Sequence, residues 1–364
     1  MKTDQKNNLS LPRRDFIKKA SLGALAFSFP FPELPEELKE LPMGVVVHSY
    51  SSRWRSKIKS LDYPGFSDAL GLIRHCDEIG AGGVQVGVSG WTDDFSKKVR
   101  EEREKRGLYL EGSISLPKEE SAIDKFEKEV LAAKEAGATV LRTACLSGRR
   151  YENFKKESEY LAFKREAIES MERAEPIVRK HKMKLAIENH KDWTALELVD
   201  ILENLGSEWI GATLDFGNNI SLLEDPMEVI RTLAPVSFST HVKDMGVKEY
   251  EEGFLLSEVP LGEGIIDLKE AVSLCRKYNP EIQFSLEMIT RDPLKIPCLE
   301  EDYWGTFGEM SASQLAKTLK MVRQKEIKGE LPKLTDLTEE QKLANEEHNI
   351  RECLNYSSSI LKIG

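Results

Sequence analysis

The chain has 364 residues, of which 52 are basic and 62 acidic; its formal net charge is −10, and 40% of its residues are hydrophobic. This composition excludes disordered and collagen-like proteins, and the excess of acidic residues predicts no nucleic-acid partner. The cysteines are odd in number and widely spaced, which indicates neither a disulfide framework nor a paired zinc motif: Cys76, Cys145, Cys275, Cys298 and Cys353.

Residues 1–42 have the pattern of a targeting segment followed by a linker. A basic start leads into the apolar run ASLGALAFSF and then into the proline-rich FPFPELPEELKELP. The core PRRDFIKK, with Arg13, Arg14, Phe16 and Lys18, resembles a twin-arginine export signal, which implies a periplasmic or cell-surface location. The apolar run is about half of the roughly 20 residues that a spanning helix needs, so we expect no stable membrane span. A basic amphipathic helix is the alternative.

From residue 43 to residue 290, short β-branched segments alternate with longer amphipathic stretches. Helical patterns cover 65–81, 122–138 and Glu157–His181. Eight segments are typical of strands: 44–49, 83–88, 108–113, 139–144, 184–189, 210–215, 236–242 and 282–288. This α/β pattern predicts a (β/α)8 TIM barrel, which usually occupies about 250 residues. A doubly wound open sheet is the alternative.

Residues 291–364 are more polar and form a predicted C-terminal extension. Helices are expected over Ser311–Lys325 and Thr338–Tyr356. We expect them to pack on the outside of the barrel, although a contact between two copies in a homo-oligomer is the alternative.

Four consecutive predicted strands end in a side chain that can bind a metal ion. They are Glu188 in AIENH, Asp215 in TLDFGN, His241 in STHVKD and Glu287 in SLEM. The carboxyl ends of parallel barrel strands meet at one mouth, so these groups are expected to lie together. Three carboxylates and an imidazole suit a divalent ion such as Mn²⁺, Mg²⁺ or Co²⁺, with Zn²⁺ also possible. For each residue alone, a helix cap, an ion pair or a core hydrogen bond is the commoner role.

Over about residues 44–290 the sequence resembles the xylose isomerase-like TIM barrel superfamily, including its ketose 3-epimerase branch. The resemblance is carried by IENH, LDFGN, THVKD and PLGEGIIDL. It implies that Glu188, Asp215, His241 and Glu287 bind the metal, and that Glu188 and Glu287 also form the catalytic acid/base pair. The sequence differs from the ketose 3-epimerase pattern at Asn218, where a His is usual, and at Lys243, where an Arg is usual.

Further polar or aromatic residues near predicted strand ends are candidate substrate contacts. They are His48, Trp54, Glu111, Arg142, His190 and Lys243. Trp54 would stack on a sugar ring, and Arg142 or Lys243 would bind an oxyanion. Ordinary loop, core or ion-pair roles are the alternatives for each.

These observations lead to the hypothesis that the protein is an exported, metal-dependent sugar isomerase or epimerase. It would act through a cis-enediolate on a small carbohydrate. Elimination from a 3-keto-glycoside at the same centre is a second hypothesis. A barrel that binds carbohydrate without catalysis is a third, because fold alone does not establish activity.

Overall fold

The computed structural model describes residues 41–54, 56–308 and 311–364. The predicted twin-arginine motif and apolar run fall on residues 1–40 and so lie outside the described residues. Within the described residues, no helix is both long enough and apolar enough to cross a membrane.

A closed barrel of eight parallel strands forms the centre of the fold and confirms the predicted TIM barrel over the open sheet. In order around the barrel, the strands are β1 (Gly44–Val46), β10 (Phe284–Leu286), β7 (Ser237–Val242), β6 (Ile210–Asp215), β5 (Lys184–Glu188), β4 (Val140–Thr143), β3 (Tyr109–Ser113) and β2 (Gly83–Gly87). Aliphatic side chains of these strands are fully buried, among them Val84, Leu110 and Leu185.

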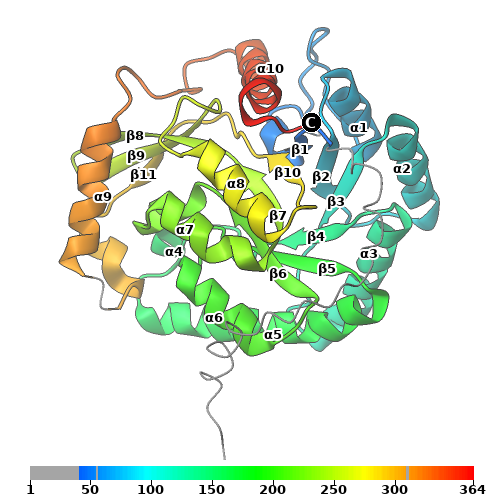
Figure 1. Cartoon of the computed structure of the whole chain (residues 1–364), viewed down its shortest axis with the longest axis horizontal. Helices are drawn as coiled ribbons and strands as arrows, with labels where there is room; N and C mark the ends of the chain where they lie inside the picture. The colour runs from blue at the N-terminus through cyan, green and yellow to red at the C-terminus, as the bar shows by residue number, and fades with distance from the viewer. Residues whose placement is uncertain (1–40, 55, 309–310) are drawn as a thin grey trace, which may run out of the picture. The chain divides into compact units, whose positions relative to one another are not determined.

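Helices surround the strands (Figure 1). They are α1 (Ala69–Glu78), α2 (Asp93–Arg106), α3 (Ile123–Glu135), α4 (Arg150–Asn153), α5 (Glu157–His181), α6 (Ala195–Leu205), α7 (Pro226–Leu233) and α8 (Leu268–Tyr278). Their limits follow local chemistry: the side chains of Asp68, Thr92 and Asp225 accept main-chain N–H bonds at the starts of α1, α2 and α7. Gly107 ends α2 at a φ of 68°, a conformation that glycine adopts without strain.

A three-stranded antiparallel sheet interrupts the last part of the barrel, and the sequence reading did not predict it. Its strands, in the order β11, β9 and β8, are Leu294–Ile296, Gly253–Val259 and Asp244–Tyr250. Asp244, the first residue of β8, fixes the turn that follows β9. Its carboxylate accepts hydrogen bonds from the main-chain N–H groups of Gly262, Gly264 and Ile266 at 2.9–3.1 Å. The sequence GEG at 262–264 is therefore a structural turn.

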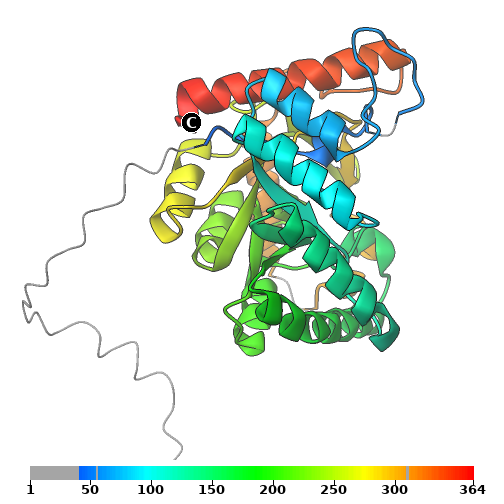
Figure 2. The ribbon, with the colours of Figure 1, turned by 90° about the vertical axis from the view of Figure 1, so that its right-hand side faces the viewer.

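The last two long helices are α9 (Ala312–Lys325) and α10 (Glu339–Tyr356). Figure 2 shows α10, in red, lying across the blue segment that follows β1. Glu346 accepts the main-chain N–H of Ser52 at 2.7 Å, and Glu347 forms a buried ion pair with Arg53 at 2.6 Å. The helix α10 therefore holds the loop after β1, which begins at the barrel mouth.

Candidate metal centre

Four neighbouring strands bring the predicted ligands to one place. Glu188 and Asp215 are the last residues of β5 and β6, His241 lies one residue before the end of β7, and Glu287 directly follows β10. Parallel pairing sets Asp215 opposite His241, and the main-chain N–H of Glu287 donates to the carbonyl of Val242 at 2.9 Å. The register of the barrel therefore decides that the four side chains converge.

One ligand atom from each of the four residues can be chosen so that all lie within 4.8 Å of one another. Glu188, Asp215 and His241 are fully buried, and Glu287 is 3% exposed. Burying three carboxylates side by side is unfavourable unless cations compensate their charge. The donor set, three hard oxygens and one imidazole, suits a divalent metal ion.

The orientation of His241 fits this interpretation. Its Nε2 lies 2.8 Å from the side-chain oxygen of Gln85, so this nitrogen is assigned as the N–H donor. Its Nδ1 has no hydrogen-bond partner and lies 3.5 Å from carboxylate oxygens of both Glu188 and Glu287. The lone pair of Nδ1 is thus directed into the carboxylate cluster, as a metal ligand requires.

Two buried cations also neutralise the cluster. The guanidinium of Arg142 donates to Glu188 Oε2 at 2.5 Å from its Nε, and the ammonium of Lys243 lies 2.5 Å from Glu287 and 2.8 Å from Asp215. Burial opposes the ionisation of Glu188 and Glu287, but Arg142 beside Glu188 and Lys243 beside Glu287 outweigh it and hold both pKa values well below the usual range. Both glutamates are therefore carboxylates at neutral pH, which is the form of a base.

Asn218, which occupies the position of the usual epimerase histidine, supports Glu188. Its side-chain N–H donates to Glu188 Oε1 at 3.1 Å, and its side-chain oxygen accepts from the buried ammonium of Lys191. The main-chain N–H of Asn218 also donates to Asp215 Oδ1 at 2.8 Å. Asn218 therefore orients two of the four predicted ligands.

Glu111 lies inside the barrel beneath the centre. Its Oε2 accepts hydrogen bonds from Gln85 and Ser239, both at 2.8 Å, and Gln85 in turn accepts from His241. Burial raises the pKa of Glu111 above its ordinary value. The chain Glu111–Gln85–His241 orients the imidazole. Sequence reasoning missed Gln85, although a polar residue in the strand sequence GVQVG was a visible signal.

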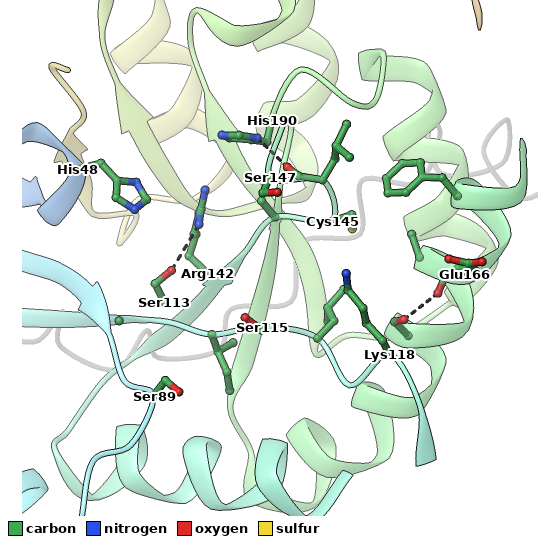
Figure 3. Close-up of a pocket in the computed structure, with 18 residues that line it drawn as sticks. His48, Ser89, Ser113, Ser115, Lys118, Arg142, Cys145, Ser147, Glu166 and His190 are labelled. Carbon is green, nitrogen blue, oxygen red and sulfur yellow. Dashed lines mark hydrogen bonds between the residues drawn. The ribbon is translucent and has the colours of Figure 1, made fainter. Parts of the chain in front are cut away.

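A cavity of about 710 Å³ opens beside the centre, over the carboxyl ends of β2, β3 and β4 (Figure 3). His48, Arg142 and His190 line the side of the cavity nearest the centre. The Nδ1 of His48 lies 3.2 Å from Glu287 Oε1, and the Nδ1 of His190 lies 2.9 Å from the carbonyl oxygen of Leu146. Burial lowers the pKa of His190 to about 4, so its imidazole is neutral and its Nε2 can accept a hydrogen bond.

The other three predicted substrate contacts do not line this cavity. Glu111 is fully buried in the barrel, and the ammonium of Lys243 is occupied by two of the predicted ligands. Trp54 is half-buried, and its main chain pairs with Phe66 in the loop after β1. Glu111 and Lys243 are placed to position other groups, because burial and existing partners occupy their polar atoms.

A closed parallel barrel whose mouth carries three carboxylates and one imidazole defines an α/β barrel protein with a candidate divalent-metal centre. The family model described as xylose isomerase-like TIM barrel matches residues 73–322, and the chain belongs to this family.

Similar proteins agree with the fold. The chain is 23% identical over 227 residues to a 3-oxo-isoapionate decarboxylase of Pectobacterium atrosepticum, covering 62% of this chain and 78% of that protein. A D-psicose 3-epimerase solved with D-fructose superposes with a TM-score of 0.55 at 15% identity, over 88% of this chain and 99% of that one. A xylose isomerase-like TIM barrel protein of Mycobacterium smegmatis in complex with magnesium superposes with a TM-score of 0.51 at 17% identity. The match covers 77% of this chain and 98% of that one.

Proposed function

We propose that the protein is a divalent-metal-dependent isomerase or epimerase that acts on a carbohydrate through a cis-enediolate. The observation that carries this proposal is the convergence of Glu188, Asp215, His241 and Glu287, with an imidazole lone pair aimed at three carboxylates. Family membership supports it, as does the fold shared with a protein named as a D-psicose 3-epimerase.

The four residues would hold Mn²⁺, Mg²⁺ or Co²⁺, with Zn²⁺ also compatible with the donors. A bound divalent ion would polarise a carbonyl group and acidify the adjacent C–H bond. The magnesium in the related Mycobacterium smegmatis protein supports a hard cation of this kind.

Glu188 and Glu287 approach the centre from different strands and would act as the acid/base pair. Because both are held as carboxylates, one removes the substrate proton and becomes the acid that can return a proton. Return of that proton by the same glutamate to the neighbouring carbon gives an isomer. An epimer requires the other glutamate, once it has taken up a proton from water, to protonate the original carbon on the opposite face, while the first glutamate releases its proton to water. Arg142, which lines the cavity, would favour the negative charge that develops on the substrate oxygens, while Lys243 holds Asp215 and Glu287 in place.

The place of action is proposed from residues 1–42 alone. The PRRDFIKK motif would direct the protein to the periplasm or cell surface by the twin-arginine route. Fusion of residues 1–42 to a reporter, compared with the same fusion carrying Arg13→Lys and Arg14→Lys, tests this. Export that does not depend on the two arginines would contradict it.

The activity is tested by NMR in deuterated water with purified, metal-loaded protein and a panel of ketoses, aldoses and 3-keto-glycosides. We expect deuterium to appear beside a carbonyl and to disappear with a chelator or with Glu287→Gln. The matched control is Glu281→Gln, an exposed glutamate just before β10, which should exchange like the wild type. No exchange on any panel member, despite bound metal, would contradict enediolate chemistry and favour the barrel that only binds carbohydrate.

A second candidate is bond cleavage at the same centre: elimination from a 3-keto-glycoside, or loss of a carboxyl group beside a ketone. The size of the cavity favours it, because about 710 Å³ can hold more than one sugar ring. The similarity to a 3-oxo-isoapionate decarboxylase also supports it. NMR spectra with the 3-keto-glycosides would then show a released aglycone, and spectra with a 3-oxo sugar acid added to the panel would show loss of carbon dioxide, in place of an epimer.

A further inference from the structure

The cavity beside the metal centre contains a second positive charge, at the end away from that centre. Lys118 lies in the loop after β3 and lines the cavity. Figure 3 shows its side chain pointing into the cavity, with the ammonium group below Cys145 and with Arg142 on the other side.

The ammonium of Lys118 makes no hydrogen bond or ion pair with any residue in the part of the chain that the structure describes. Its main chain is fixed, because the Lys118 carbonyl accepts a hydrogen bond from Arg173 of α5 at 3.1 Å. Burial raises the pKa of the Cys145 thiol, while Lys118 and Arg142 act in the opposite direction, so both cations act on the interior of the cavity. Lys118 is thus an exposed residue whose ammonium lines the cavity without a counter-ion among the described residues.

The surfaces between the two ends suit a hydroxylated ring. Ser113, Ser115 and Ser147 line the cavity with hydroxyl groups, and Phe163 supplies an apolar wall. Glu166 is the acidic side chain of the lining, and it forms no ion pair with Lys118. A ligand that reaches from the metal centre to Lys118 would place hydroxyl groups beside the serines and an anionic group beside the ammonium.

We propose that the substrate carries an oxyanion, either a carboxylate or a phosphate, several atoms away from the reacting carbon, and that Lys118 binds it. This inference rests on the proposed function, because the reacting end of the ligand is taken to lie at the metal centre. A charge-assisted hydrogen bond in a partly enclosed cavity is stronger than one between neutral groups, which makes the unpartnered ammonium selective for such substrates.

The test compares three ligands that share one ring and differ only at carbon 6: D-glucose, D-glucuronate and D-glucose 6-phosphate. Their dissociation constants are measured by calorimetry on the metal-loaded wild type and on Lys118→Gln. We expect the wild type to bind one of the two anions at least about tenfold more tightly than glucose, and Lys118→Gln to lose this preference. Which anion binds more tightly identifies the oxyanion.

Two further variants control the result. Lys98→Gln removes an exposed lysine of α2 outside the cavity lining and should keep the preference. Glu166→Gln removes the negative charge of the lining and should strengthen anion binding. A preference that survives in Lys118→Gln would mean that the anion binds another cation, such as the metal ion or Arg142. This would overturn the proposal, as would equal or undetectable binding of all three ligands by the wild type.

The same samples separate this inference from the proposed function. Deuterium exchange on sugars together with no Lys118-dependent preference would overturn the anion site and leave the enediolate chemistry standing. A Lys118-dependent preference without exchange on any sugar would leave the anion site standing and remove the proposed reaction.

Discussion

The two halves of the barrel mouth differ in chemistry. The strands β5, β6, β7 and β10 end in Glu188, Asp215, His241 and Glu287, which are buried and linked to buried cations. The strands β2, β3 and β4 end beside the cavity, which is lined by serine hydroxyls and by the ammonium of Lys118. We therefore propose that the first half, the metal half, holds the metal ion and moves the proton, and that the second, the recognition half, binds the rest of the substrate. Substitutions should be far more costly in the first half than in the second.

The largest effect is expected from Asp215→Asn. The amide keeps the shape of the side chain but loses the charge that a divalent ion needs, so metal affinity should fall by at least about 100-fold. Competition with a fluorescent chelator measures it. The exposed Asp200→Asn of α6 is the matched control and should bind metal like the wild type. Unchanged affinity in Asp215→Asn would place the metal elsewhere.

A smaller loss of metal affinity is expected from Gln85→Met. This substitution removes the hydrogen bonds that connect Glu111 to His241 and leaves all four predicted ligands unchanged. Loss of the group that orients an imidazole typically costs about 10- to 100-fold in metal affinity. Glu111→Gln should add little to Gln85→Met, because both act through the same imidazole. Additive losses in the double variant would show that Glu111 and Gln85 act separately.

Glu224 lies behind the predicted metal ligands and is linked to Asp215 through two asparagines. Its carboxyl group accepts hydrogen bonds from the main-chain N–H of Ala195 and from Asn219, which in turn accepts from Asn189, a partner of Asp215. Burial raises the pKa of Glu224 to about 7. The folded protein therefore binds this proton more tightly than the unfolded chain, and the stabilisation is complete below about pH 4 and is lost as the pH rises through 7.

We therefore expect the free energy of unfolding of the wild type to fall by about 1 to 2 kcal/mol more than that of Glu224→Gln between pH 5 and pH 8. Urea denaturation of the metal-free proteins measures it, with the exposed Glu203→Gln as the control. Parallel pH profiles for the wild type and Glu224→Gln would contradict the raised pKa.

The smallest effect is expected in the recognition half. Ser113→Ala removes one cavity hydroxyl, which also accepts a 3.4 Å hydrogen bond from Arg142. We expect KM for the substrate to rise about 2- to 10-fold, the value of one neutral hydrogen bond, with metal affinity unchanged. A loss of metal affinity in this variant would show that the two halves are not independent.

The barrel could be predicted because its signal repeats. Each β-branched segment followed by an amphipathic stretch must bury one face, and eight such units in succession close into a barrel. The clustering of Glu188, Asp215, His241 and Glu287 followed from the same rule, since the carboxyl ends of parallel strands share one mouth. Their roles as ligands and as acid/base pair stay predictions.

The sequence could not predict details that depend on neighbours distant in the chain. The first strand was expected to reach residue 49, but it ends at Val46, where the turn η2 (Val47–Tyr50) begins; Ser49 in this turn bonds to Leu286 and Met288. The hairpin of β8 and β9 was missed although both strands lie within residues 244–259, and the third strand of the sheet comes from residues 294–296, which no local pattern links to the hairpin.

By itself, the sequence determined the fold class and which residues stand at the strand ends, because both depend on periodicity along the chain. Only the tertiary structure decided that Lys243 pairs with Asp215 and Glu287, that Gln85 orients His241, and that Lys118 points into the cavity without a counter-ion. The physical reason is that partner, burial and charge balance are properties of three-dimensional neighbours, which local pattern does not encode.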